Sequence, residues 1–199
     1  GGNPKGAKET RDYVTWIMAR FTAGQGEFTK PTPAEINARI ETDPSIANDL
    51  RARKAAREYA DRHQVALMGP HEDDAFWIDQ LPMQGHRFGF PPLKAFKPDR
   101  WLKQGDELSF GEQKLEVHHT PGHTPGHVVF HHRAVGLAIV GDVLFDGSIG
   151  RTDFPRGNHA DLIASIQREL WPMGNDTRFV PGHGPMSSFG EQREHNPYV

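Results

Sequence analysis

The stretch from Thr120 to His127 reads T-P-G-H-T-P-G-H and places two histidines in a loop rich in glycine and proline. Each histidine follows a glycine, so little backbone bulk surrounds it and its imidazole can be aimed at a metal ion. Imidazole is the commonest side-chain ligand for metals in proteins. The stretch therefore indicates metal chemistry, with His123 as the first candidate ligand.

Two more candidates stand where apolar strands end. Asp142 follows the strand of I-V-G-D, and His183 follows a strand in V-P-G-H-G-P. Taken singly, Gly-His-Gly is a weak signal, and an aspartate after a strand is often a turn or cap residue. Together, His123, Asp142 and His183 form a set of two nitrogens and one oxygen, which suits zinc or non-haem iron. We predict these three side chains as metal ligands.

Four further histidines belong to predicted strands rather than to loops. They are His118, His119, His131 and His132. Because they alternate along these strands, we expect them at the surface or behind the ligands, not as ligands.

Hydrophobic periodicity predicts an alternation of strands and helices after His63. The expected strands are 65–68, 107–110, 114–118, 128–132, 137–140 and 178–180, and the expected helices are 72–81 and 160–170, with a loop over 82–98. This order favours an α/β fold in which helices pack on a sheet.

In the first 62 residues, the spacing of apolar residues and the capping residues predict helices and no strands. The expected helices cover 10–21, a segment capped by Thr32, and a segment from Pro44 to about His63. A break in composition near residue 50 divides the chain into a helical segment, 1–50, and a second part, 51–199.

Composition narrows the class of protein. The chain has 199 residues, no cysteine and a formal net charge of −3. Thiolate ligands and disulfides are excluded, and the charge disfavours attraction to nucleic acid or to an anionic membrane. No apolar run approaches the roughly 20 residues that a membrane helix needs. We expect no membrane partner and a cytoplasmic location.

The motifs resemble those of the metallo-β-lactamase superfamily, in particular its short type II glyoxalase (hydroxyacylglutathione hydrolase) branch. They are T-P-G-H-T-P-G-H, the strand-terminal G-D at 141–142, G-R-T-D-F at 150–154, P-G-H-G-P at 181–185 and E-H-N-P at 194–197. The resemblance covers roughly residues 53–199. It implies a mixed-sheet sandwich with helices and metal-dependent hydrolysis of a small-molecule thioester or other acyl substrate.

The resemblance also implies roles for individual residues. His123 would bind a first metal, His183 a second, and Asp142 would bridge them as the catalytic carboxylate. His127 would support the ligands, and Arg151 with Asp153 would order the neighbouring loop.

The sequence departs from this family at its first metal-binding motif, H-x-H-x-D-H. The corresponding slot, 47–52, reads A-N-D-L-R-A, in which only Asp49 could bind a metal, and no histidine precedes His63. We therefore expect an incomplete sandwich and an incomplete centre that holds one zinc ion rather than two, with iron or manganese as alternatives. Activity would be weak or lost, and residues 1–50 would be an unrelated segment, joined by rearrangement, engineering or natural fusion.

Two other functions stay open. The chain could be a non-catalytic scaffold or binding protein. Nucleic-acid binding through a basic helix is a further, disfavoured hypothesis, since Glu58 and Asp61 interleave with its cations; these are Arg51, Arg53, Lys54, Arg57 and Arg62.

Overall fold

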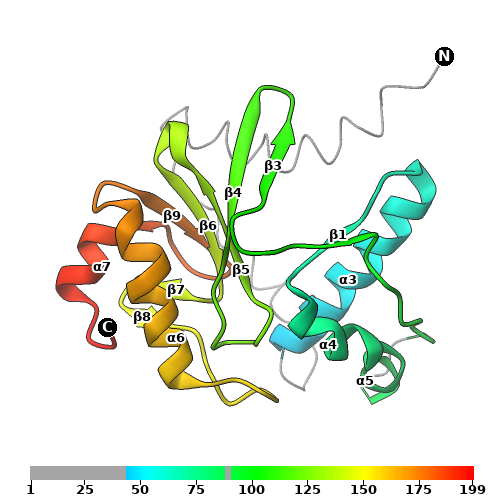
Figure 1. The fold of residues 1–199 in the computed structure, drawn as a ribbon. Coiled ribbons are helices and arrows are strands. Elements are labelled where there is room, and N and C mark those ends of the chain that lie inside the picture. Colours follow the sequence, from blue (N-terminus) through cyan, green and yellow to red (C-terminus); the bar gives the residue numbers. More distant parts are fainter. Residues whose placement is uncertain (1–43, 88–90) are drawn as a thin grey trace. The chain divides into compact units, whose positions relative to one another are not determined.

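The structure is a computed structural model that describes residues 44–87 and 91–199 (Figure 1). The chain divides into two compact units. Among the described residues, the first unit holds 44–67, 76–87 and 91–100, and the second holds 68–75 and 101–199. The helices predicted for 10–21 and after Thr32 lie outside the described residues.

The first unit is helical. It contains α3 (Pro44–His63), most of α4 (Ala75–Asp79) and α5 (Leu81–Arg87). The prediction of a helix from Pro44 to about His63 is confirmed. Its buried apolar side chains are Ala60, Trp77, Ile78, Leu81 and Leu93. On α3, Lys54 pairs with Glu58 and Arg57 with Asp61.

The strand predicted for 65–68 is wrong, because β1 covers only Met68–Gly69. Gln64 adopts a positive φ of 52°, and the amide of Val65 donates to the carbonyl of Ala60 at 3.1 Å. These residues close the carboxyl end of α3, where such a left-handed residue commonly terminates a helix. Val65, the first residue of the apolar run, therefore caps α3, and only Met68 of the run belongs to β1.

The helix predicted for 72–81 is divided, and the loop predicted for 82–98 begins too early. A 3-10 turn, η1 (Glu72–Asp74), precedes α4, and α5 occupies 81–87. Pro82 lies in the first turn of α5, where a missing N–H costs nothing. A short strand, β2 (Arg100–Trp101), follows the remaining loop.

The second unit contains a six-stranded sheet in the order β10-β9-β6-β5-β4-β3. Neighbouring strands are antiparallel except β6 and β9, which run parallel. The strands are β3 (Glu107–Phe110), β4 (Gln113–His119), β5 (Val128–His132), β6 (Leu137–Gly141), β9 (Arg178–Pro181) and β10 (Ser187–Ser188). The five strands predicted between 107 and 180 are confirmed.

Helices on one side of this sheet complete the core of the unit (Figure 1). They are α6 (His159–Ser165), its π-helical continuation η3 (Ile166–Leu170), the turn η4 (Trp171–Met173) and α7 (Phe189–His195). The core consists of Val129, Ala138, Val140, Val143, Leu144, Leu162, Ile166, Leu170, Phe179 and Phe189. A mixed sheet with helices confirms the α/β fold class.

Three short elements connect these strands. The turn η2 (Arg133–Val135) joins β5 to β6, and β7 (Leu144–Phe145) forms a small hairpin with β8 (Ser148–Ile149). Within the described part of the chain, no helix is both long and apolar enough to cross a membrane.

Candidate metal centre

Asp142 and His183 meet because their strands are parallel neighbours. Gly141 at the end of β6 pairs with Pro181 at the end of β9, so the residues that follow emerge at the same edge of the sheet. The Nδ1 atom of His183 lies 3.0 Å from Oδ1 of Asp142. A Cβ atom on Gly182 would lie 2.2 Å from the same Oδ1. Glycine is therefore required there for the carboxylate to take this position.

His123 approaches the other oxygen of the same carboxylate. Its Nε2 atom lies 3.7 Å from Oδ2 of Asp142. Its Nδ1 atom lies 2.8 Å from the backbone oxygen of Arg151 and donates to it, which leaves the Nε2 lone pair toward Asp142. A backbone carbonyl behind a histidine in this way is typical of metal-binding histidines. The structure thus places both predicted imidazole ligands, those of His123 and His183, beside the carboxylate of Asp142, the third predicted ligand.

The electrostatics of the site keep this carboxylate ionised. Burial alone would raise the pKa of Asp142, but the hydrogen bond with His183 and the nearby imidazoles outweigh it and hold the pKa below its usual value. The side chains of His123, Asp142 and His183 are 12%, 24% and 58% exposed. The centre is therefore open to solvent on the side of His183.

His127 lies behind the site as a neutral imidazole. Burial, with a smaller effect of His123, lowers the pKa of His127 to about 4. The amide of Asp142 donates to its Nε2 at 3.3 Å, and its Nδ1 lies 3.2 Å from Oγ1 of Thr120. That hydroxyl can in turn donate to the backbone oxygen of His127, at 3.4 Å. The neutral ring fixes the backbone of Asp142, in line with the supporting role implied for it.

A buried carboxylate outside the predicted site residues holds the histidine loop, residues 120–127. Asp74 in η1 is 5% exposed. Its Oδ1 accepts from the amide of Gly126 and its Oδ2 from the hydroxyl of Thr124, both at 2.7 Å. In the sequence, Asp74 belongs to the run E-D-D, which indicates only the first turn of a helix. Its partners lie about fifty residues away, so no local signal could identify its role.

The glycine before His123 is explained by packing rather than by space around the imidazole. Gly122 has a φ of 141°, and a Cβ atom there would lie 2.4 Å from backbone atoms of Leu162 in α6. Its carbonyl accepts from the amide of Asn158 at 2.8 Å. Ser165 of α6 also donates to the carbonyl of Pro121 at 2.8 Å. The loop is thus pressed against the helix that covers the sheet.

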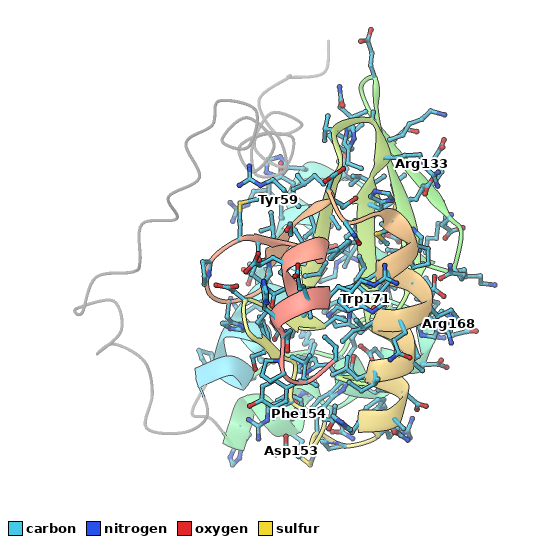
Figure 2. The ribbon with its side chains drawn as sticks, turned by 90° about the vertical axis from the view of Figure 1, so that its left-hand side faces the viewer. Tyr59, Arg133, Asp153, Phe154, Arg168 and Trp171 are labelled. Carbon is cyan, nitrogen blue, oxygen red and sulfur yellow. The ribbon has the colours of Figure 1, made fainter. Side chains whose placement is uncertain are left out.

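The G-R-T-D-F segment forms one wall beside His123. The guanidinium of Arg151 donates to both carboxylate oxygens of Asp153, at 2.6 and 2.7 Å, and lies over the ring of Phe154. Figure 2 labels Asp153 and Phe154. The hydrogen bond from Arg151 lowers the pKa of Asp153 to about 2. Phe154 presents its ring to His123, with centroids 5.2 Å apart. The ordering role implied for Arg151 and Asp153 agrees with these contacts.

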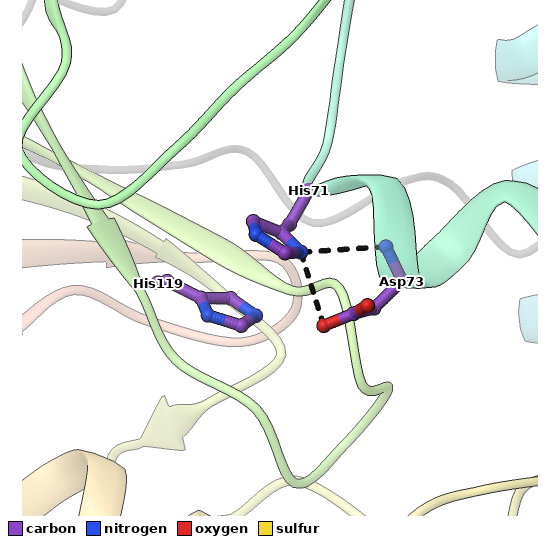
Figure 3. A group of neighbouring side chains, drawn as sticks. All are labelled: His71, Asp73 and His119. Atoms are coloured by element: carbon purple, nitrogen blue, oxygen red, sulfur yellow. Dashed lines mark hydrogen bonds and ion pairs between the residues drawn. The ribbon is translucent and has the colours of Figure 1, made fainter.

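Among the described residues, two other groups have ligand atoms within 4.8 Å of one another, and the group of His123, Asp142 and His183 is not one of them. The first comprises His71, Asp73 and His119 (Figure 3). The imidazoles of His71 and His119 are stacked, with an interplanar angle of 15° and centroids 4.0 Å apart. Since a nitrogen lone pair lies in its ring plane, stacked rings do not point at a common ion. His71 instead caps η1 through the amide of Asp73.

The second group comprises Glu116, His118 and His131. His131 and the adjacent His132 are buried, at 5% and 2% exposure, so of the two places expected for them, at the surface or behind the ligands, the surface is excluded. The side chain of Asp49, the one candidate in the slot of the absent motif, lies outside the described part.

The chain belongs to the metallo-β-lactamase superfamily, whose family description it matches over residues 54–183. Hydroxyacylglutathione hydrolase GloC of Haemophilus influenzae is 42% identical to it over 146 residues, which are 73% of this chain and 69% of that protein. The chain spans 60% and 62% of the next two curated relatives.

Solved structures agree with this assignment. The BLEG-1 B3 metallo-β-lactamase has a TM-score of 0.64 at 32% identity, over 73% of this chain and 70% of that one. TTHA1623 in a di-iron-bound form has the same TM-score and identity, over 73% and 71%. The superfamily predicted from the motifs is therefore confirmed.

Proposed function

We propose that this chain is a metal-dependent hydrolase of small-molecule thioesters, with a centre built on His123, Asp142 and His183. One observation carries the proposal: each carboxylate oxygen of Asp142 faces one imidazole, that of His183 or that of His123. Asp142 and His183 are brought together because they follow two neighbouring parallel strands. The substrate class, a hydroxyacyl thioester of glutathione, rests on the similarity to a hydroxyacylglutathione hydrolase.

The donor set fits zinc. Two imidazoles and an ionised carboxylate are ligands that zinc accepts, and a three-ligand zinc site leaves a position for water or substrate. Bound zinc would supply a nucleophilic water near neutral pH and polarise a carbonyl oxygen. We favour one zinc ion, with iron or manganese as alternatives, since the sequence lacks H-x-H-x-D-H.

The chain's own residues would prepare this site. Asp142 supplies negative charge, the carbonyl of Arg151 holds the tautomer of His123, and neutral His127 fixes the backbone of Asp142. His183, the most exposed of the three ligands, stands where a substrate would enter. The proposal treats residues 51–199 as the hydrolase portion and 1–50 as a separate segment.

Metal content tests the proposal first. Zinc, iron and manganese would be measured per chain in the unaltered protein and in Asp142→Asn and His183→Ala. The matched controls are Asp176→Asn and His159→Ala, which change exposed residues of the same types. Asp142→Asn and His183→Ala should each hold about one ion per chain fewer than the unaltered protein, and the control pair should hold as many as it does. Equal metal content in all variants would contradict the assigned ligands.

Hydrolysis of a hydroxyacylglutathione thioester is the second step of the test. The rate should follow metal content across the same variants. A folded chain without metal and without a rate above buffer would favour the alternative, a non-catalytic scaffold. That alternative has support in the absent motif and in the separation of the three ligands, which do not all lie within 4.8 Å of one another.

A further inference from the structure

Three side chains with ligand atoms lie together on β4 and β5, and none of them belongs to the proposed centre. Glu116 pairs directly with His131 across the two strands, and His118 is two residues along β4 from Glu116. Residues two apart on a strand share a face, so all three lie on the same face of the sheet. Val129 and Ala138, on that face, belong to the core shared with η3. The three side chains thus lie on the side that the helix covers.

Their ligand atoms converge. Oε2 of Glu116 lies 3.8 Å from Nε2 of His118 and 3.8 Å from Nδ1 of His131. The two imidazole planes are inclined by 57°, with centroids 6.1 Å apart. Unlike the stacked pair of His71 and His119, inclined rings can point their lone pairs at a common position.

The two imidazole nitrogens that face Glu116 are buried and have no hydrogen-bond partner. The side chain of His131 is only 6% exposed. A buried polar atom without a partner costs on the order of 1–3 kcal/mol, so native proteins seldom leave one unmatched. Two such atoms that face the same carboxylate point to a missing common partner.

A second carboxylate lies behind His118. Nδ1 of His118 lies 3.2 Å from Oε2 of Glu169, in η3. Glu169 is held in turn by Arg168, at 2.7 Å, and by Gln104, at 2.9 Å (Figure 2 labels Arg168 on its helix). When Nδ1–H donates to Glu169, Nε2 carries the free lone pair. A carboxylate behind a histidine in this way raises its basicity and sets its orientation as a metal ligand.

We propose that Glu116, His118 and His131 form a second metal site, for a zinc-class divalent ion. With bonds of about 2.0–2.1 Å, ligand atoms of a tetrahedral zinc site lie about 3.3 Å apart. The two 3.8 Å separations would need to shorten by about half an ångström, which side-chain rotations can supply. Water would complete the coordination, and the ion would join β4 to β5 and, through Glu169, to η3.

Arg133 competes with the ion. Its Nε donates to Oε1 of Glu116 at 3.1 Å and its Nη2 to Oε2 at 2.8 Å. An ion on Oε2 would compete with the positively charged Nη2 for that oxygen, while Nε can keep its bond to Oε1. The side chain of Arg133 is 75% exposed, so it can move aside at little cost (Figure 2). Arg133→Ala should therefore tighten metal binding, whereas a purely structural salt bridge would leave it unchanged.

Zinc binding to the full-length chain tests the proposal. Equilibrium dialysis would use a His123→Ala/His183→Ala background, in which the proposed centre has lost both imidazoles. We expect about one zinc ion per chain in this background. Glu116→Gln and His118→Gln should each weaken binding by more than tenfold, and Glu169→Gln by about 10–100-fold. His131 is left unchanged because its buried side chain makes a folding defect hard to separate.

Two exposed residues provide matched controls, Glu112→Gln and His159→Gln, which should bind zinc as the background does. Circular dichroism would establish that every variant is folded. Absence of zinc binding in the folded background, or binding that survives Glu116→Gln and His118→Gln unchanged, would overturn the proposal. Neither result depends on hydrolysis or on the centre at Asp142, so the two proposals can fail separately.

Discussion

Replacing Asp74 should loosen the loop that carries His123 without touching any proposed ligand. Its carboxylate accepts two short hydrogen bonds, from the amide of Gly126 and the hydroxyl of Thr124, in a site that is 5% exposed. A hydrogen bond to a charged group contributes about 1.5–3 kcal/mol. Asp74→Ala removes both acceptors and leaves a buried N–H unmatched. We expect it to lower the free energy of unfolding by about 3 kcal/mol or more.

The isosteric replacement makes the reasoning sharper. In Asp74→Asn the amide oxygen can still accept from Gly126, while the new NH₂ group can donate to the hydroxyl of Thr124, which accepts as well as donates. Both contacts survive as neutral hydrogen bonds, so we expect a loss of only about 1 kcal/mol. The order of damage should be Ala greater than Asn, even though Asn removes the same charge.

Urea unfolding followed by circular dichroism measures both effects, with Asp79→Asn as an exposed control expected to change stability by less than about 0.5 kcal/mol. Thr124→Val should cost about 1 kcal/mol alone and much less in the Asp74→Ala background, because the pair shares one interaction. Equal stability of Asp74→Ala and the unaltered chain would refute the role of Asp74 in holding the loop. Additive effects of Asp74→Ala and Thr124→Val would refute it as well.

Three further predictions concern the site and the buried amide of Gln192 in α7. Gly182→Ala should weaken metal binding at the centre of His123, Asp142 and His183 by about tenfold or more, since its Cβ would lie 2.2 Å from Oδ1 of Asp142; unchanged affinity at that centre would contradict this. Burial lowers the pKa of His127 from 6.5 to about 4. The free energy of unfolding should therefore be unaffected by this residue above pH 6.5 and fall by up to about 3 kcal/mol as the pH drops to 4. It falls because the imidazole takes up its proton in the unfolded chain at a higher pH than in the folded one. Urea midpoints between pH 7 and 4.5 test this, and the slope should flatten in His127→Gln. Gln192→Leu should cost about 2–4 kcal/mol in the same assay, since the buried amide of Gln192 accepts from Gly147; a loss below 1 kcal/mol would be evidence against it.

Much of the second unit could be predicted from the sequence. Alternating apolar residues locate β3 to β6, and glycine- and proline-flanked polar residues at strand ends locate His123, Asp142 and His183. The parallel pairing of β6 with β9 then brings the last two together. Such signals are local, since each depends on a strand and the few residues that follow it.

Contacts between distant segments could not be predicted in the same way. Val65 has the residue type of a strand, but the left-handed turn at Gln64 makes it the cap of α3. The pair of Glu116 with His131 depends on the register of β4 against β5. Those strands are joined by the long histidine loop, whose length does not set a register as a two-residue hairpin turn would. Hence the proximity of Glu116, His118 and His131 could not be predicted from the sequence.

The parallel pairing of β6 with β9 also has a consequence for folding. Parallel strands need a crossover, and here the crossover contains α6 and η3, so Asp142 and His183 are far apart until the sheet and its helix have assembled. Long-range pairing of this kind forms slowly. A metal ion that needs both side chains would bind the assembled state and hardly the unfolded one, and it would stabilise the fold in proportion to the logarithm of its free concentration. The supply of metal would then affect the stability of the folded chain as well as the proposed hydrolysis.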